Sequence, residues 1–401
     1  MASRLAWLDY SDHERRKALE VIDLFHEEET RDELGIGSIR DSFADQLFPG
    51  TSTIQTRARY FFFIPWIYLE LESHRNPHHE VALRLRRHEV RLMDELAESE
   101  DTRGVIGKQS RDSLKRLPSS VYWSGLGTWG IRKFRGSQED YHRILGSVHE
   151  FERRRSRRDD GELLDDLGRE NWHSNLPAAP DEFPSEAIFE LTQYEADYLT
   201  DRVRSHATGT MIATLLDRGN STDCGYPWEH PQLRECPETV QTQVSHADNF
   251  SLSMHGAALL YNLMLAEKSN WEARVEAYHD ALIEWWDSLN DQNAQLSQWD
   301  REIFWKVAGD GNTRIPNRTR RFVDAWLDAV FAMNNFQDIV ESKELRAMIS
   351  EREYTLKHAR ARLHNPRALE NWRGKAGTAR IDFRWKSAQD IINDVLWAKG
   401  R

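Results

Sequence analysis

An arginine and a histidine one or two turns apart on a helix form the pattern in this sequence with the most direct chemical use. Such a pair can cleave RNA without a metal ion, because the imidazole acts as general acid or base while the guanidinium stabilises the transition-state phosphate. Arg352 and His358 have this spacing inside an arginine-rich stretch. Arg274 and His279 form a second such pair. The pattern arises easily in an arginine-rich chain, so a solvated helix face is the competing interpretation.

Metal and cofactor chemistry has little support in the residue pattern. Four residues offer the thiolate and imidazole groups that zinc prefers: Cys224, His230, Cys236 and His246. Structural zinc sites favour close pairs such as Cys-x-x-Cys, and the spacing here is irregular, which favours ordinary loop residues. The sequence also lacks a phosphate-binding P-loop, a Gly-x-Ser-x-Gly nucleophile elbow and a His-x-Lys nuclease pair. We therefore expect no metal and no cofactor.

Basic residues are concentrated in two stretches of an acidic chain whose net charge is −12. Residues 103–158 hold 14 Lys or Arg against 5 Asp or Glu, a net charge of +9, and residues 343–386 hold 12 against 5, a net of +7. Both stretches also contain aromatic residues, and this mixture suits phosphate binding combined with base stacking. The alternative is that these arginine-rich faces pair with the acidic remainder of the chain.

If the basic stretches bind DNA or RNA, their lysines and arginines are the expected contacts. The candidates are Lys108, Arg111, Lys115, Arg116, Arg132, Lys133, Arg135, Arg360, Arg362, Arg373 and Lys375.

The elements that must position these residues are organised around residues 60–69, ten residues without a charge, six of them aromatic. This run is far shorter than the ~20 apolar residues needed to cross a bilayer, so we expect a buried helix and no membrane partner. The helix is expected to start near Thr53 and to kink at Pro65, which lacks an amide hydrogen. Arg57 and Arg59 lie at the start of this core, so the charge of each needs a partner or contact with water.

The periodicity elsewhere predicts a mainly α protein with a few short strands. A capping box at Thr192 and Glu195 predicts a helix start. Further helices are expected at 38–48, 77–99, 210–216, 249–266, 271–289, 300–307, 318–333, 343–363 and 387–397. Residues 103–135 suggest a helix-turn-helix or winged-helix variant, but a compact helical subdomain with Trp123 and Trp129 in its core is the favoured interpretation. The alternation at 380–385 suggests a small strand. His255, on an apolar helical face, is expected to be a hydrogen-bonded core histidine.

The composition suggests a two-domain globular chain. We expect an N-terminal helical domain at 1–152 with a basic subdomain at 103–152, a charged, proline-containing linker at 153–184, and a C-terminal helical domain at 185–401. Two cysteines do not make a disulfide framework, and no secretory signal is visible, so a cytoplasmic location is expected.

Four segments resemble an uncharacterised prokaryotic family over nearly the whole chain. They read LAWLDYSD, IRDSFADQLFPGTSTIQTRARYFFFIPWIYLE, LPSSVYWSGLGTWGIR and RIDFRW. That family is a domain of unknown function found near helicases, methyltransferases and phospholipase D-like nucleases in anti-phage defence islands. The resemblance implies a helicase or nuclease encoded nearby as a partner, and it implies no catalytic residues.

These observations favour a non-catalytic accessory or sensor subunit of a prokaryotic antiviral defence system. It would contact nucleic acid or a DNA-processing partner through its basic stretches. A HEPN-like, metal-independent ribonuclease acting through Arg352 and His358 is the enzymatic alternative. A protein–protein scaffold without nucleic-acid contact is the third hypothesis.

Overall fold

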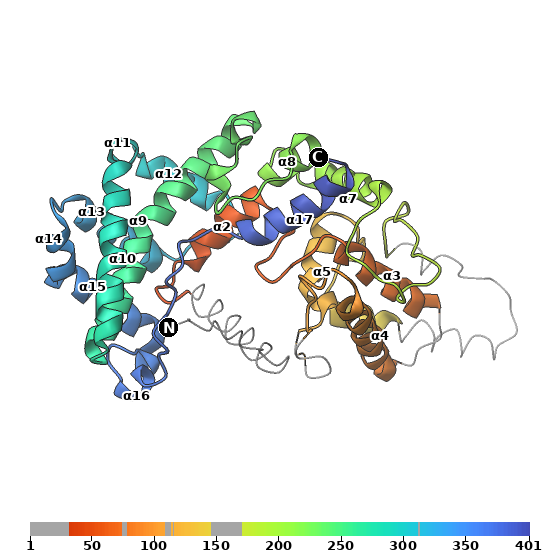
Figure 1. Ribbon diagram of the computed structural model, residues 1–401, viewed down its shortest axis with the longest axis horizontal. Helices are drawn as coiled ribbons and strands as arrows, with labels where there is room; N and C mark the ends of the chain where they lie inside the picture. The colour runs from red at the N-terminus through yellow and green to blue at the C-terminus, as the bar shows by residue number, and fades with distance from the viewer. Residues whose placement is uncertain (1–31, 74–77, 109–113, 115, 146–170, 312) are drawn as a thin grey trace, which may run out of the picture. The chain divides into compact units, whose positions relative to one another are not determined.

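The computed structural model describes residues 32–73, 78–108, 114, 116–145, 171–311 and 313–401. The described residues are predominantly helical, which confirms the mainly α class; their β-structure is one isolated antiparallel bridge between Arg132 and Trp172. Contacts divide the chain into two compact units. The first unit contains Met1–Phe43 and Gln243–Phe383, and the second contains Ala44–Thr242 and Arg384–Arg401. Figure 1 shows the helices of both.

Helix α3 (Tyr60–Ser73) is the centre of the second unit. Its residues 60–68 are all buried, and the helix packs against α4 (His78–Glu98) and α5 (Pro118–Thr128). Aromatic rings make much of this contact: Phe61 stacks on Trp129 with ring centroids 4.0 Å apart. The helix begins at Tyr60 rather than near Thr53, because the chain before it turns and the Thr56 amide donates to the Tyr122 hydroxyl at 2.9 Å.

The two arginines that precede α3 have the buried partners that the sequence required. Arg57 Nε lies 3.0 Å from Asp394 Oδ2, and the two side chains are 6% and 3% exposed. Arg59 Nη2 lies 3.2 Å from Glu195 Oε1. The expectation that each arginine needs a partner at this end of the core is therefore confirmed.

The second unit is completed by three helices from distant parts of the chain. Helix α7 (Gln193–His206) begins with the capping box expected at Thr192, and α8 (Met211–Arg218) follows it. Helix α17 (Trp385–Ala398) packs on both of them, although it lies near the other end of the sequence. Two short 3-10 turns, η2 (Pro227–Glu229) and η3 (Leu233–Glu235), lie in the loop after α8.

The first unit is built around the long helix α9 (Glu238–Lys268), whose first residues belong to the second unit. Helix α10 (Glu272–Asp291) runs beside it (Figure 1), and the Trp285 indole donates to Leu252 O at 2.8 Å. The Trp326 indole of α13 (Asn317–Phe331) donates to Ser253 O at 3.0 Å, which docks a second helix on α9. The remaining elements are α2 (Gly37–Leu47), which crosses into the second unit, α11 (Asn293–Leu296), α12 (Arg301–Gly309), α14 (Phe336–Glu341), α15 (Lys343–Lys357), η4 (His358–Arg360) and α16 (Pro366–Leu369).

The prediction of a strand at 380–385 is wrong. Phe383 and Arg384 form a turn with positive φ values, and Trp385 begins α17, while side chains of α9 bind carbonyl groups of residues 376–381. Ser251 Oγ donates to Ile381 O at 2.7 Å, and Asn262 Nδ2 donates to Ala376 O at 2.7 Å. His255 Nε2 donates to Thr378 O at 2.9 Å, and burial lowers the pKa of this imidazole to about 4. His255 is thus the hydrogen-bonded core histidine that was expected.

Two further expectations bear on domain organisation. Within the described part of 103–135 one helix forms, α5, so a helix-turn-helix is not seen in those residues. The linker expected at 153–184 lies mostly outside the described residues, and the sequence-based domain boundaries stay a prediction. None of the described helices has both the length and the apolar character needed to cross a membrane.

Candidate nucleic-acid interface

The second basic stretch, residues 343–386, uses much of its charge in ion pairs within the protein. The pairs are Arg346 with Glu267, Lys357 with Glu33 and Glu353, Arg362 with Glu33, Arg380 with Asp248, and Arg384 with Asp45. Burial opposes ionisation of Glu33, but Lys357 and Arg362 hold the pKa of its carboxyl below the ordinary value. These ion pairs support the alternative interpretation, in which the basic residues of this stretch pair with acidic residues elsewhere in the chain.

Arg352 and His358 do not form a joint site. Arg352 is buried and donates to Leu34 O at 2.8 Å and to Gly35 O at 3.0 Å, so its guanidinium holds the chain before α2. His358 lies just past the end of α15, exposed, with a φ of +48°. The arginine that would stabilise a phosphate is thus enclosed, while the histidine faces solvent.

The other side chains predicted to contact nucleic acid differ in how exposed they are. Arg132 lies 4.4 Å from the Trp123 ring centroid and donates to the Phe134 carbonyl, so it is largely used in packing. Lys108 Nζ donates to Thr102 Oγ1 at 2.8 Å. The exposed candidates are Lys108, Arg116, Lys133, Arg135, Arg360 and Arg373, and Lys375 is half-buried. Arg111 and Lys115 lie outside the described residues.

A group of exposed arginines that sequence reasoning did not select lies at the start of α13. We call Arg314, Arg318, Arg320 and Arg321 the α13 arginine cluster; all four are exposed. Residues 306–323 hold five basic residues and one acidic residue. The local net charge of +4 over 18 residues is denser than in either of the basic stretches chosen from the sequence.

Two members of the α13 arginine cluster, Arg314 and Arg320, line a hollow of about 440 Å³. Its lining comprises Trp305, Gly309, Gly311, Thr313, Arg314, Ile315, Asn317 and Arg320. The Arg320 guanidinium lies 5.1 Å from the Trp305 ring centroid, and Trp305 Nε1 donates to Asp324 Oδ1 at 2.8 Å. The indole and the carboxylate therefore fix one arginine at the wall of the hollow.

The first turn of α13 adds positive potential to the same place. Pro316 occupies the N-cap position, and no side chain caps the helix. Uncapped amides at a helix start carry partial positive charge and favour anions, as guanidinium groups do. Thr319, one turn in, is buried and donates to Gly35 O at 3.2 Å, which anchors the helix start within the first unit. The arrangement can therefore hold phosphate groups.

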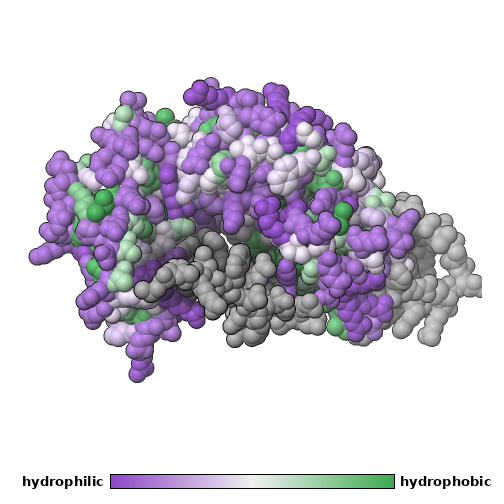
Figure 2. Space-filling view, viewed as in Figure 1, coloured by the Kyte–Doolittle hydropathy of each residue, from purple (hydrophilic) through white to green (hydrophobic). Residues whose placement is uncertain are grey.

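The face of the molecule in Figure 2 is mostly hydrophilic, with apolar side chains in small separate areas. A polar ligand suits that face better than an extended apolar partner does. Among the residues that the structure describes, no group of three His, Cys, Asp or Glu side chains could hold a metal ion.

Several carboxyl groups of the second unit have raised pKa values, among them Glu89 and Glu72. Glu89 of α4 is fully buried and accepts hydrogen bonds from Ser119 N at 2.6 Å and Ser119 Oγ at 3.1 Å; burial raises its pKa to about 8. Burial likewise raises the pKa of Glu72 to about 7, although the Trp172 indole donates to it at 3.0 Å. Glu89 holds the start of α5, and Glu72 holds the segment at 172, so we assign both a structural role.

The signal for the α13 arginine cluster was present in the sequence TRIPNRTRR, directly before an amphipathic helix. Summing charge over stretches of about fifty residues diluted it with neighbouring acidic residues. The positions of Trp305 and of the hollow depend on the fold and had no sequence signal of their own.

The comparisons with known proteins give one result. A family model described as a family of unknown function, DUF6361, matches residues 2–398. No curated protein and no solved structure matches the chain. The match spans almost the whole sequence, as the resemblance implied. The chain belongs to DUF6361, a family of unknown function.

Proposed function

We propose that this protein is a non-catalytic accessory subunit of a prokaryotic anti-phage defence system, and that it contacts DNA or RNA through the α13 arginine cluster. The observation that supports nucleic-acid contact is the set of four exposed arginines at an uncapped helix start, two of which, Arg314 and Arg320, line a hollow of about 440 Å³. Their guanidinium groups suit the phosphates of a nucleic-acid backbone, which they can bind through paired N–H donors. The defence role and a helicase or nuclease partner rest on the family resemblance alone.

Phosphate contact has a quantitative signature in salt dependence. Each neutralised phosphate releases counterions, so the logarithm of affinity falls with the logarithm of salt concentration by about 0.9 per contact on duplex DNA and about 0.7 on single strands. Removing two contacting arginines should therefore reduce that slope by about 2 on duplex DNA or by about 1.4 on a single strand.

The test is fluorescence anisotropy with labelled single-stranded DNA, duplex DNA and RNA of one length over a series of KCl concentrations. The variant is Arg318→Ala with Arg321→Ala, two exposed side chains of the cluster. The matched control is Arg218→Ala with Arg234→Ala, two exposed arginines of the second unit. We expect the first pair to weaken binding at least tenfold and to flatten the slope, and the control to bind as the wild type does. Equal slopes for both pairs would refute contact through this cluster.

The accessory role is tested by purifying the tagged protein from its host with and without nuclease treatment. A helicase or nuclease that co-purifies and is lost after treatment supports a shared nucleic acid. A partner that stays bound in high salt after treatment would replace the proposal with the scaffold hypothesis.

A further inference from the structure

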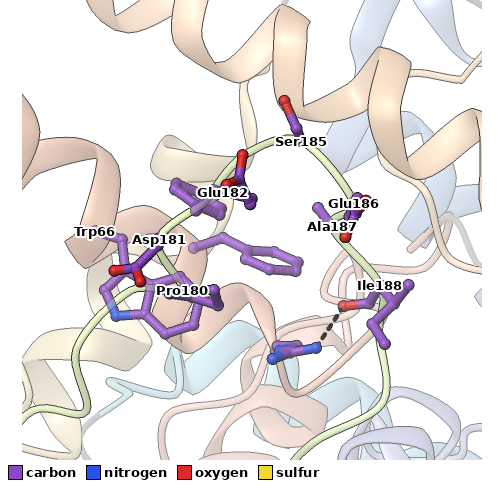
Figure 3. A pocket seen from close by; sticks show the side chains of 11 residues that line it. Trp66, Pro180, Asp181, Glu182, Ser185, Glu186, Ala187 and Ile188 are labelled. Carbon is purple, nitrogen blue, oxygen red and sulfur yellow. Dashed lines mark hydrogen bonds between the residues drawn. The ribbon is translucent and has the colours of Figure 1, made fainter.

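Stacking of an unpaired base on a protein requires an aromatic ring with an open face. The pocket under the loop at residues 180–188, shown in Figure 3, offers little ring surface, because Phe63 and Trp66 in its wall are 1% and 3% exposed and both pack on Phe183. Tyr354, in the last turn of α15 in the first unit, is instead 50% exposed. Its ring is therefore open to a planar ligand.

Two exposed histidines frame the Tyr354 ring. The ring centroid of His364 lies 5.0 Å from that of Tyr354, and the ring of His358 stands nearly perpendicular to it, at 6.0 Å and 80°. His364 Nε2 lies 2.9 Å from Ser350 Oγ, which fixes this imidazole on α15, and the His358 amide donates to Tyr354 O. The aromatic surface is thus ordered before a ligand arrives, which lowers the entropic cost of binding.

The segment that carries these histidines is strongly basic. Residues 357–367 hold four Lys or Arg and no Asp or Glu. Two of the four, Lys357 and Arg362, pair with the buried Glu33. The other two, Arg360 and Arg367, are exposed and have no acidic partner among the residues that the structure describes. They are therefore available to an anion.

Asn365 brings the two exposed arginines together. Its Nδ2 donates to Ala359 O at 2.6 Å, and its Oδ1 accepts from the Arg367 amide at 3.0 Å. One side chain thus joins the residue before Arg360 to the backbone of Arg367, so both arginines extend from neighbouring points of the chain. We call Tyr354, His358, Arg360, His364 and Arg367 the Tyr354 patch.

The Tyr354 patch combines an open ring with two cations that can bind phosphates. Glu351, one turn before Tyr354, is also exposed, and it leaves the two arginines in excess. A duplex could use only the arginines, because its bases are stacked on one another. A single strand could use both parts, since its bases can be splayed out onto aromatic side chains.

We propose that the Tyr354 patch binds one unpaired nucleotide of a single strand, with the base stacked on Tyr354 and the neighbouring phosphates on Arg360 and Arg367. This inference rests on the proposed function and names its substrate class, which is single-stranded DNA or RNA. The α13 arginine cluster binds phosphates of either form, and the Tyr354 patch adds the preference for an unpaired strand.

The test is fluorescence anisotropy of the full-length protein with three labelled probes of one length: oligo(dT), duplex DNA, and an abasic strand that has phosphates but no bases. We expect Tyr354→Ala to weaken oligo(dT) binding by about fivefold to 150-fold, the equivalent of about 1–3 kcal/mol for one stacked base. The duplex and the abasic strand should bind this variant as they bind the wild type. Tyr354→Phe, which keeps the ring, should bind oligo(dT) normally. The matched control is Tyr194→Ala, at a tyrosine of the second unit that is 65% exposed.

Two charge variants test the phosphate contacts. Arg360→Ala with Arg367→Ala should reduce the salt slope on oligo(dT) by about 1.4. Glu351→Gln should strengthen oligo(dT) binding, because it removes a negative charge beside the ring. Unchanged oligo(dT) affinity of Tyr354→Ala, an equal loss on the abasic strand, or a failure of Tyr354→Phe to restore binding would overturn the proposal.

The α13 double variant, measured with the same probes, separates this inference from the proposed function. If that variant loses affinity and Tyr354→Ala does not, the proposed function stands and the inference is refuted. The opposite pattern supports the Tyr354 patch and refutes contact through the α13 arginine cluster. If none of the probes binds the wild type, both are refuted.

Discussion

Replacing Glu89 by Gln should flatten the pH dependence of stability. Glu89 is fully buried, and its pKa rises from an ordinary 4.5 to about 8. Between these values the native state holds a proton that the unfolded state has released. The free energy of unfolding therefore falls as pH rises, by up to about 1.4 kcal/mol per pH unit for one proton. The stabilisation is complete below the unfolded pKa and is lost as pH rises through the folded pKa.

Glutamine resembles the protonated acid in shape and in hydrogen bonding. Its carbonyl can accept from Ser119 N, and its amide can donate to Ser119 Oγ. Near pH 5 we therefore expect a small difference in stability between Glu89→Gln and the wild type. As pH rises toward 8, the free energy of unfolding of the variant should increase relative to that of the wild type by about 1 kcal/mol or more per pH unit.

The assay is urea denaturation followed by tryptophan fluorescence at pH 5.5, 6.5, 7.5 and 8.5. Subtracting the wild type from the variant cancels all titrating groups that the two share. Glu98→Gln, an exposed change on the same helix, is the matched control and should give a difference that is flat with pH. A flat difference for Glu89→Gln as well would refute the claim that Glu89 is protonated in the folded protein at neutral pH.

Three further changes test the packing of the second unit. Asp394→Asn should cost up to about 3 kcal/mol of stability in urea denaturation, because the buried Arg57 charge loses its partner at 3.0 Å and retains Asp101, which is 37% exposed. Gly50→Ala should lower the melting temperature in calorimetry by the equivalent of at least about 2 kcal/mol; φ there is +87°, and the new Cβ would lie 2.3 Å from Trp129 Nε1. Thr192→Ala should cost about 1 kcal/mol in the same calorimetric measurement, because it removes the cap of α7, and Thr192→Ser should restore most of that loss.

Local signals predicted the helices well. The capping box at Thr192 and Glu195 formed as expected, and the uncharged run around Pro65 became the buried centre of the second unit. The need of Arg57 for a buried partner was also readable, since an unpaired charge in a core is too costly. The identity of that partner, Asp394, was not readable, because the pairing depends on a contact between residues far apart in the sequence.

The candidate site was harder to predict for the same reason. The fold decides whether an arginine faces solvent or an acidic partner. Arg362 pairs with Glu33, more than 300 positions away in the sequence. Arg352 is buried and donates to a carbonyl group of the chain before α2. Arg318 carries the same charge and is exposed. Composition does not distinguish these three arginines. It could therefore indicate phosphate binding but could not identify the residues that bind the phosphate.

The order in which the chain is made bears on how the second unit forms. Helices α7 and α8 precede the segment Gln243–Phe383, whereas α17, which packs on them, follows it. At a synthesis rate of roughly 5–20 residues per second, the roughly 140 residues in between take about 7 to 28 s. During that interval α7 and α8 lack their contact with α17, whose Ile391, Ile392 and Val395 are buried in the finished protein. The nascent second unit thus has a period of exposure in which a chaperone or a binding partner can reach a surface that the finished protein conceals.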